Sequence, residues 1–310
     1  FDKVPKFIHH HPKHVILTSI EFDHADIYKD LEDVKSAFAQ LLVRIPKSGR
    51  LIYNAEDQNI LDLLKSTKSK MQNPELFSYG LQKGDYMARI LQQSETGIEF
   101  DVIFNGQKIE TFSLPMVGAY NVLNATATIA MVHRLGWSME KSKLALTKFL
   151  GVKRRQEIRG EPDGVLVIED FAHHPTAVRE TVKAVHEKYP QKRIFSVFEP
   201  RSATSRRKVF QSDYLKAFDG SYQIILAEAF DQSRIAAEDR FSSQELVQGL
   251  QEKSMKATVL SGADAIVQFL NQQTQTGDVV LIMSNGGFGG IYEKLLSTLS
   301  QREVLSENRL

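Results

Sequence analysis

Five short apolar runs in the second half of the chain constrain its fold more than any other feature. Each run is apolar almost throughout rather than on alternate residues, and helical patterns lie between the runs. Such runs, separated by helices, are typical of a parallel sheet that is covered on both faces. The predicted strands are residues 165–170, 193–198, 222–227, 257–260 and 278–283. We therefore expect an α/β domain with a mostly parallel sheet.

The first half of the chain predicts a mixed α/β unit. Its expected helices repeat apolar residues at the helical period, and its expected strands include a pair joined by the two-residue turn Asn105-Gly106. The predicted strands are His14–Ser19 and residues 51–53, 86–92, 97–104 and 108–114, and the predicted helices are Leu31–Ile45, Asp57–Leu64, Val117–Leu135 and residues 138–149. The segment GVKRRQEIRGEPDG, residues 151–164, has little periodicity, and we expect the domain boundary there.

Composition excludes several classes of protein. The chain has 310 residues, with 39 basic and 38 acidic side chains, so no strong field favours nucleic acid or an anionic membrane. It contains no Cys, which excludes disulfides and fits a reducing, cytoplasmic setting. No apolar run reaches the ~18 residues that a membrane helix needs. The chain does not begin with Met, so we expect it to be part of a longer protein.

The turns after the apolar runs are where functional residues are expected, because ligands of parallel sheets bind beyond the carboxyl ends of the strands. In VIEDFAHHPTAV, Asp170 ends a run, and His173 and His174 follow in a turn before a helix that begins near Pro175. A carboxylate at this edge can bind ribose hydroxyls or pair with a cation. A His there can orient a substrate or transfer a proton.

Two later turns also carry suitable side chains. Arg201 and Ser202 follow the run 193–198, and Arg is suited to hold a substrate carboxylate, although a structural turn fits these residues equally well. Ser284 and Asn285 begin SNGGFGG after the last run, where glycines allow close backbone approach to a ligand. This segment is not a G-x-G-x-x-G dinucleotide fingerprint.

Three further polar segments each have a structural alternative when read alone. EFDHAD offers Asp23, His24 and Asp26 to a divalent cation, or caps the next helix. Asn121 and Asn124 stand three residues apart at a helix start, where they can present donors and acceptors to adenine or serve as caps. The arginines of GVKRRQEIRG suit phosphate, but a basic run is usually a solvated face.

Taken in order, these motifs resemble the Mur ligase family over nearly the whole chain. EFDHADIY resembles a central-domain segment whose His helps to bind a second magnesium ion, and VGAYNVLNATATIA resembles the G-x-H-N-x-x-N-A helix, whose Asn residues approach adenine. VKRRQEIRG resembles the crossing into the C-terminal domain, whose second Arg meets the ATP phosphates. EDFAHHPTA resembles the D-Y-A-H-x-P motif of that domain. Four motifs in one order argue against a chance match.

The resemblance implies a fold and a reaction. Residues 1–150 would be the C-terminal portion of the central, ATPase domain, and residues 151–310 a Rossmann-like C-terminal domain. ATP, with Mg²⁺, would phosphorylate a carboxylate, and an amine would attack the acyl phosphate to form an amide. FAHHPTA resembles the ligases that act on UDP-N-acetylmuramate. FEPRS and MSNGGFGG resemble the variant that attaches L-alanyl-γ-D-glutamyl-meso-diaminopimelate in peptidoglycan recycling, and the L-alanine-adding ligase is the alternative.

The resemblance also implies a role for each candidate residue. Arg155, Asp170 and His173 would be catalytic. The expected contacts are the metal for His24, adenine for Asn121 and Asn124, a terminal phosphate for Arg155, the ribose or a cation for Asp170, the substrates for His173 and His174, and the incoming peptide for Arg201, Ser202, Ser284 and Asn285.

The sequence departs from the family pattern in four respects. The phosphate loop G-x-x-G-K-[ST] and the acidic E-x-D-E segment do not occur, and nothing in the 310 residues corresponds to the family's UDP-binding N-terminal domain. Tyr120 stands where the family usually has His. We therefore expect the 310 residues alone to be inactive, which leaves a non-catalytic nucleotide-binding module as an alternative. The related folate-polyglutamate ligases are disfavoured by the text His173-His174-Pro175.

Overall fold

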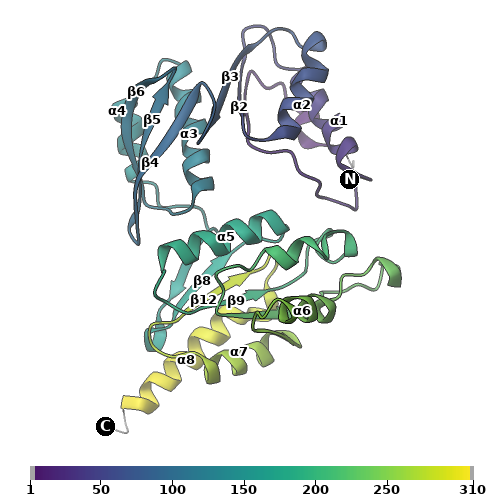
Figure 1. The fold of residues 1–310 in the computed structure, drawn as a ribbon, viewed down its shortest axis with the longest axis vertical. Coiled ribbons are helices and arrows are strands. Elements are labelled where there is room, and N and C mark those ends of the chain that lie inside the picture. The colour runs from purple at the N-terminus through teal and green to yellow at the C-terminus, as the bar shows by residue number, and fades with distance from the viewer. Residues whose placement is uncertain (1–3, 308–310) are drawn as a thin grey trace. The chain divides into compact units, whose positions relative to one another are not determined.

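Each half of the chain is organised around its own six-stranded sheet (Figure 1). The structure is a computed structural model that describes residues 4–307. The chain divides into two compact units, with the boundary between Leu150 and Gly151. In the described residues, no helix is both long and apolar enough to cross a bilayer.

The first unit has a mixed sheet in the order β1–β2–β3–β4–β5–β6. Strands β1 to β4 pair in parallel, and β4, β5 and β6 pair antiparallel. The strands are β1 (His14–Leu17), β2 (Arg50–Asn54), β3 (Glu75–Gly80), β4 (Tyr86–Ser94), β5 (Gly97–Phe104) and β6 (Gln107–Leu114). The α-helices are α1 (Leu31–Leu42), α2 (Gln58–Thr67), α3 (Ala119–Arg134) and α4 (Met139–Thr147). The predicted mixed α/β class is therefore confirmed.

Local sequence signals account for two of these elements. Asp57 caps α2: its Oδ1 accepts a hydrogen bond from the Ile60 N–H at 3.0 Å, and its Oδ2 accepts one from the Ile20 N–H at 3.0 Å. Asn105 and Gly106, with φ of 48° and 81°, form the two-residue turn between β5 and β6. Both features were expected from the sequence, and both are confirmed.

The second unit has its strands in the order β11–β10–β9–β12–β8–β7. All neighbouring strands are parallel except β7, which runs antiparallel to β8. The strands are β7 (Glu157–Gly160), β8 (Leu166–Asp170), β9 (Ile194–Phe198), β10 (Gln223–Ala227), β11 (Ala257–Leu260) and β12 (Val279–Met283). The α-helices are α5 (Pro175–Lys188), α6 (Ser243–Glu252), α7 (Gly262–Gln273) and α8 (Ile291–Glu307). The five predicted strands are all present, and the mostly parallel sheet is confirmed.

Both faces of this sheet are buried along its central strands, which explains why those strands are mostly apolar. Alternate residues of one strand enter different cores: Leu166 and Ile168 of β8 pack with α5 and α6, whereas Val167 packs with α7 and α8. Figure 1 shows α5 on one side of the sheet and α7 and α8 on the other. Most polar residues of the central strands lie at the strand ends, and Ser196 is a buried exception inside β9.

The antiparallel part of the first sheet contains a buried carboxylate, Asp101. We expect its contribution to the free energy of unfolding to depend on pH. Asp101 on β5 is 2% exposed. It accepts hydrogen bonds at 2.7 Å from Lys108 Nζ, Arg89 Nη2 and Thr111 Oγ1. The Lys108 bond, then those of Arg89 and Thr111, hold the pKa of Asp101 well below its usual range. A depressed folded-state pKa contributes stability above the unfolded pKa, and this stability is lost as the pH falls below about 4.

Replacing Asp101 with Asn should therefore lower the free energy of unfolding by about 1–2 kcal/mol near neutral pH, since two of the three donors are well exposed and keep their hydration. Urea unfolding of the 310-residue chain at several pH values measures this. The deficit should shrink below about pH 4. Glu99→Gln, on the same strand and exposed, is the matched control. A deficit that stays constant into acid would contradict the assigned role.

Candidate functional site

Three turns begin at the same level of the second sheet. Met283, the last residue of β12, pairs with Asp170 of β8 on one side and Phe198 of β9 on the other. The Ser284 N–H donates to the Asp170 carbonyl, and the Glu199 N–H donates to the Met283 carbonyl, both at 3.1 Å. The segments after β8, β9 and β12 therefore lie side by side, as the rule for parallel sheets predicts.

Asp170 joins three parts of the second unit. Its side chain is 2% exposed. Oδ2 accepts a hydrogen bond from the Gln156 N–H at 2.9 Å, and Oδ1 accepts from the Ala172 N–H at 2.7 Å and from Thr181 Oγ1 at 3.4 Å. Burial raises the pKa of Asp170, although these bonds and the nearby Arg155 charge oppose that rise. The carboxylate thus links the segment before β7, the turn after β8 and the middle of α5. Contact with a ribose or a cation stays a prediction.

The two adjacent arginines before β7 have different environments. Arg154 Nε donates to Glu169 Oε1 at 2.6 Å, and its Nη2 donates to the carbonyls of Ser284 and Gly286 at 2.9 and 2.8 Å. Arg155 is exposed, with its Cζ 5.2 Å from the centroid of the Phe171 ring. Arg154 is therefore an internal brace, whereas the guanidinium of Arg155 is open to solvent, in keeping with the predicted phosphate contact.

The two histidines lie in the turn between β8 and α5. His174 caps α5, because its Nδ1 accepts a hydrogen bond from the Thr176 N–H at 3.3 Å, and its ring packs on Phe210 at 4.7 Å between centroids. His173 Nδ1 lies 2.9 Å from the Phe171 carbonyl oxygen. A carbonyl oxygen only accepts, so His173 carries a proton on Nδ1. The predicted substrate contacts of both residues stay predictions.

A carboxylate that the sequence reasoning missed connects two predicted residues. Glu199, directly after β9, is 5% exposed. Its Oε1 accepts a hydrogen bond from Arg201 Nη1 at 3.3 Å, and its Oε2 accepts one from Ser284 Oγ at 2.5 Å. Arg201 and Ser284 therefore belong to one network at the carboxyl edge of the sheet. The signal was present in FEPRS, where an acidic residue immediately follows a buried strand.

The other two predicted peptide contacts differ in burial. Ser202 is buried, and its Oγ donates to Ser205 Oγ at 2.8 Å, while each of these two hydroxyls accepts the other residue's N–H at 2.9 Å. Ser202 thus shapes its own turn. Asn285 is half-buried, and its Oδ1 lacks a hydrogen-bond partner among the described residues. An unpaired buried amide oxygen is costly, so this atom is suited to receive a donor from a ligand.

Two candidate residues of the first unit, Asn121 and Asn124, lie in the first two turns of α3. Asn121 is 8% exposed and its Nδ2 donates to the Val117 carbonyl at 2.7 Å, whereas Asn124 is exposed. The amide of Asn121 therefore anchors the start of α3, and Asn124 is the more accessible of the pair. Their predicted contact with adenine stays a prediction.

His24 is exposed and adopts a φ of 56°, with its carbonyl accepting from the Ile27 and Tyr28 N–H groups. In residues 4–307 no three His, Cys, Asp or Glu side chains gather closely enough to hold a metal ion. The predicted contact of His24 with a magnesium ion, directly or through water, stays a prediction.

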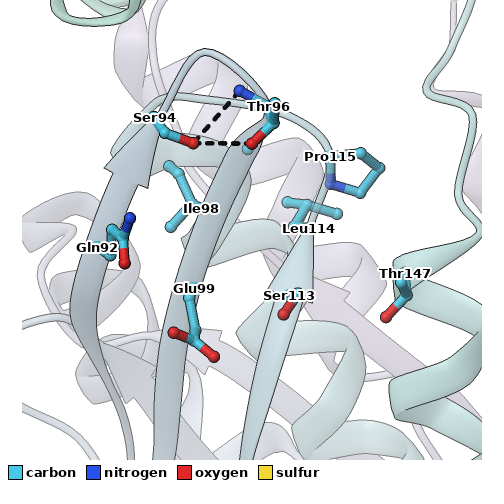
Figure 2. Close-up of a pocket in the computed structure, with 10 residues that line it drawn as sticks. Gln92, Ser94, Thr96, Ile98, Glu99, Ser113, Leu114, Pro115 and Thr147 are labelled. Carbon is cyan, nitrogen blue, oxygen red and sulfur yellow. Dashed lines mark hydrogen bonds between the residues drawn. The ribbon is translucent and has the colours of Figure 1, made fainter.

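A surface pocket of the first unit is lined by a different set of residues. Figure 2 shows it between the ends of β4, β5 and β6, with Thr147 of α4 at its side. Its lining is mostly exposed and polar, and Ser94 Oγ and Thr96 Oγ1 lie 2.9 Å apart at its rim. The lining residues are Gln92, Ser94, Thr96, Gly97, Ile98, Glu99, Ser113, Leu114, Pro115 and Thr147. None of the residues predicted to be functional belongs to this set.

Comparison with known proteins finds two matching family models. Residues 5–132 match the Mur ligase middle domain, and residues 154–286 match the Mur ligase, glutamate ligase domain. Together these matches cover well over half of the chain.

Individual relatives agree with these domains. A UDP-N-acetylmuramate–L-alanine ligase of Clostridium tetani is 36% identical over 90% of this chain and 59% of its own length. UDP-N-acetylmuramate–L-alanyl-γ-D-glutamyl-meso-2,6-diaminoheptandioate ligase of Escherichia coli is 33% identical over 97% of this chain and 63% of its own length. The crystal structure of a murein peptide ligase from Psychrobacter arcticus is 28% identical, with a TM-score of 0.65, over 96% of this chain and 60% of that one.

Several further relatives of similar identity also carry the L-alanine ligase name. The chain spans about six tenths of the length of the curated relatives it matches. The order of the elements, the two domain models and these relatives agree with one another. The chain therefore belongs to the Mur ligase family, through its middle and glutamate ligase domains.

Proposed function

We propose that the complete protein is an ATP-dependent ligase that joins L-alanyl-γ-D-glutamyl-meso-diaminopimelate to UDP-N-acetylmuramate. The observation that carries the proposal is the Arg201 guanidinium, which is partly exposed at the carboxyl edge of the second sheet and shares Glu199 with Ser284. A fixed guanidinium suits a peptide that is rich in carboxylates. The name and 33% identity of the E. coli relative support this choice of substrates.

The reaction would begin with transfer of the terminal phosphoryl group of ATP to the muramoyl carboxylate. The free amine of the peptide would then attack the acyl phosphate carbon, and the products would be an amide, ADP and phosphate. The protein must align the reactants, neutralise phosphate charge and exclude water from the intermediate. These substrates would place the protein in peptidoglycan recycling in the cytoplasm, and thus in maintenance of the cell wall, with consequences for cell shape and division.

Within this proposal the residues keep the roles that the family resemblance implies. Arg155 would bind a terminal phosphate, and His173 would orient the substrates. The remaining contacts would be the ribose or a cation for Asp170, adenine for Asn121 and Asn124, Mg²⁺ for His24, and substrate for His174, Ser202, Ser284 and Asn285. Mg²⁺, when bound, would neutralise charge on the phosphates.

The second candidate function is addition of L-alanine to UDP-N-acetylmuramate, which the names of several relatives favour. A third candidate, from a different class, is a nucleotide-binding module without turnover. It is favoured by the absence of Gly-Lys-Ser/Thr from these 310 residues.

An acceptor assay on the complete protein separates the three candidates. Phosphate release is measured with ATP, Mg²⁺ and UDP-N-acetylmuramate, with either the tripeptide or L-alanine as acceptor. We expect a tripeptide specificity constant, kcat/KM, at least tenfold above that for L-alanine, since only the tripeptide offers several carboxylates (about 1.4 kcal/mol). Preference for L-alanine would favour the second candidate. Nucleotide binding without turnover would favour the third.

Arg201→Ala should raise the KM for the peptide more than the KM for ATP. Loss of a charge-assisted hydrogen bond to a peptide carboxylate predicts a rise of about 30-fold in the peptide KM. Steady-state kinetics with each substrate varied in turn measure both constants. Arg179→Ala is the control, because Arg179 is exposed on α5 and its partner among residues 4–307 is its neighbour Glu180. Equal effects on the two constants would argue against a peptide site at Arg201.

A further inference from the structure

The guanidinium of Arg201 makes a hydrogen bond to Glu199 along its edge and stacks on the ring of Phe230 with its face. Nη1 donates to Glu199 Oε1 at 3.3 Å, and the Cζ atom lies 3.7 Å from the centroid of the Phe230 ring. Phe230 stands three residues after β10, in a segment to which the sequence reasoning assigned no residue. Its side chain is 43% exposed, so it is not a core residue. A cation centred over an aromatic face is the geometry of a cation–π contact.

Gly286 is a third residue that contacts the side chain of Arg201, beside Glu199 and Phe230. A Cβ atom built on Gly286 would lie 2.1 Å from Arg201 Nε and 2.2 Å from its Cδ. Even an alanine at this position would therefore displace the arginine side chain. Gly286 does not have a positive φ, so close approach, not backbone conformation, is what requires glycine here.

Hydrogen bonds fix the segments that carry Glu199, Phe230 and Gly286. The Phe230 N–H donates to the Pro200 carbonyl at 3.0 Å, and Arg206 Nη1 donates to the Asp231 carbonyl at 2.5 Å. The Gly286 N–H donates to Ser284 Oγ at 3.0 Å, and that hydroxyl donates to Glu199. The segments after β9, β10 and β12 therefore form one connected frame around the side chain of Arg201.

The frame leaves most of the guanidinium available. Among the described residues, Glu199 is the hydrogen-bond partner of Arg201, so one of its five N–H donors is used. The side chain is 29% exposed. A long, flexible side chain normally loses rotamer freedom when it binds a ligand, and holding it in advance removes much of that cost.

We infer that Phe230 and Gly286, with Glu199, are positioning residues that hold Arg201 ready to bind a carboxylate of the acceptor substrate. This inference rests on the proposed function. Phe230 stacks beneath the cation, Glu199 sets its rotation about the ring normal, and the bare backbone of Gly286 gives it room. Neither Phe230 nor Gly286 needs to touch the substrate, because both act through Arg201.

Coupling between two substitutions tests this inference in the complete protein. Phe230→Ala should raise the KM for the acceptor about tenfold and leave the KM for ATP and the unfolding midpoint unchanged. Phe230→Tyr keeps the ring and should restore the acceptor KM. In the Arg201→Ala background, Phe230→Ala should add nothing, since a residue that acts through Arg201 has no effect once Arg201 is gone. Val209→Ala, an exposed apolar residue of the same unit, is the control.

Gly286→Ala is the second variant. In the otherwise wild-type protein, Gly286→Ala should raise the acceptor KM. In the Arg201→Ala background, it should have no further effect. An unchanged acceptor KM in Phe230→Ala, or additive effects in the double variants, would overturn the inference while leaving the ligase activity in place. If the wild-type protein used neither acceptor, the proposed function would fail instead. The positioning of Arg201 would then be tested without substrates.

A measurement without substrates separates those two failures. The Arg201 Nε–H signal in the NMR spectrum of the 310-residue chain, assigned by its loss in Arg201→Ala, reports the motion of the side chain. We expect an order parameter near that of a rigid group (about 0.85) in the wild type and below about 0.6 in Phe230→Ala. A signal equally mobile in both proteins would show that Phe230 does not hold Arg201.

Discussion

Arg155→Ala in the complete protein is expected to lower kcat by at least about 100-fold, with the fold intact. The guanidinium is exposed and rests on Phe171, with its Cζ 5.2 Å from the ring centroid, so its removal breaks no hydrogen bond to a buried group among the described residues. If it neutralises charge that develops on a terminal phosphate, its loss destabilises the transition state directly. Single-turnover phosphoryl transfer, with ATP saturating, measures this step.

The matched control is Lys153→Ala, two residues earlier in the same basic segment and also exposed. Simple loss of positive charge from this segment would affect both variants alike, whereas a specific phosphate contact affects Arg155 alone. Arg155→Lys should recover part of the rate, because Lys supplies charge but not the planar, bidentate geometry of Arg. Unchanged turnover in Arg155→Ala would remove the phosphate role.

The sequence predicted the central strands of the second sheet because their residues are almost all apolar and buried. β8, β9 and β12 are buried at every position, and their sequences are apolar apart from Ser196 inside β9 and the acidic end of β8. β7 was missed because it has four residues, of which Ile158 is exposed, and it exists through pairing with β8 rather than through a pattern of its own. β3 was missed for a related reason: its first residues, Glu75 and Leu76, are exposed, so it shows neither alternation nor a buried run.

The candidate site was predictable in its location but not in its internal bonding. The rule for parallel sheets placed polar turns after β8, β9 and β12 at one edge, and the strand register bears this out. The sequence could not show that Glu199 joins two of these turns, because that bond depends on side-chain positions from segments 85 residues apart. It also could not show that Arg154 is bonded internally while Arg155 is exposed, because the bonds of Arg154 reach segments far away in the sequence.

Arg154 is where that distinction has its largest effect on stability. Glu169 is 3% exposed and accepts from Arg154 Nε at 2.6 Å and from Arg159 Nη1 at 3.0 Å. Arg154 Nη2 also donates to the carbonyls of Ser284 and Gly286. Arg154→Ala therefore leaves a buried carboxylate with half of its counter-charge and two carbonyls without this donor. Such losses predict a decrease of about 3 kcal/mol in the free energy of unfolding.

Urea unfolding of the 310-residue chain measures that decrease, with Lys153→Ala and Arg155→Ala as neighbours that should stay within about 0.5 kcal/mol of the wild type. Arg154→Lys should recover little, since an ammonium group cannot reach Glu169 and two carbonyls in three directions at once. The φ of 61° at residue 154 does not confound the comparison, because Arg, Lys and Ala all carry a Cβ and bear the same backbone strain. A stability loss in Arg155→Ala as large as that in Arg154→Ala would mean that the two side chains share the bracing role, and the case for Arg155 as a dedicated phosphate ligand would weaken with it.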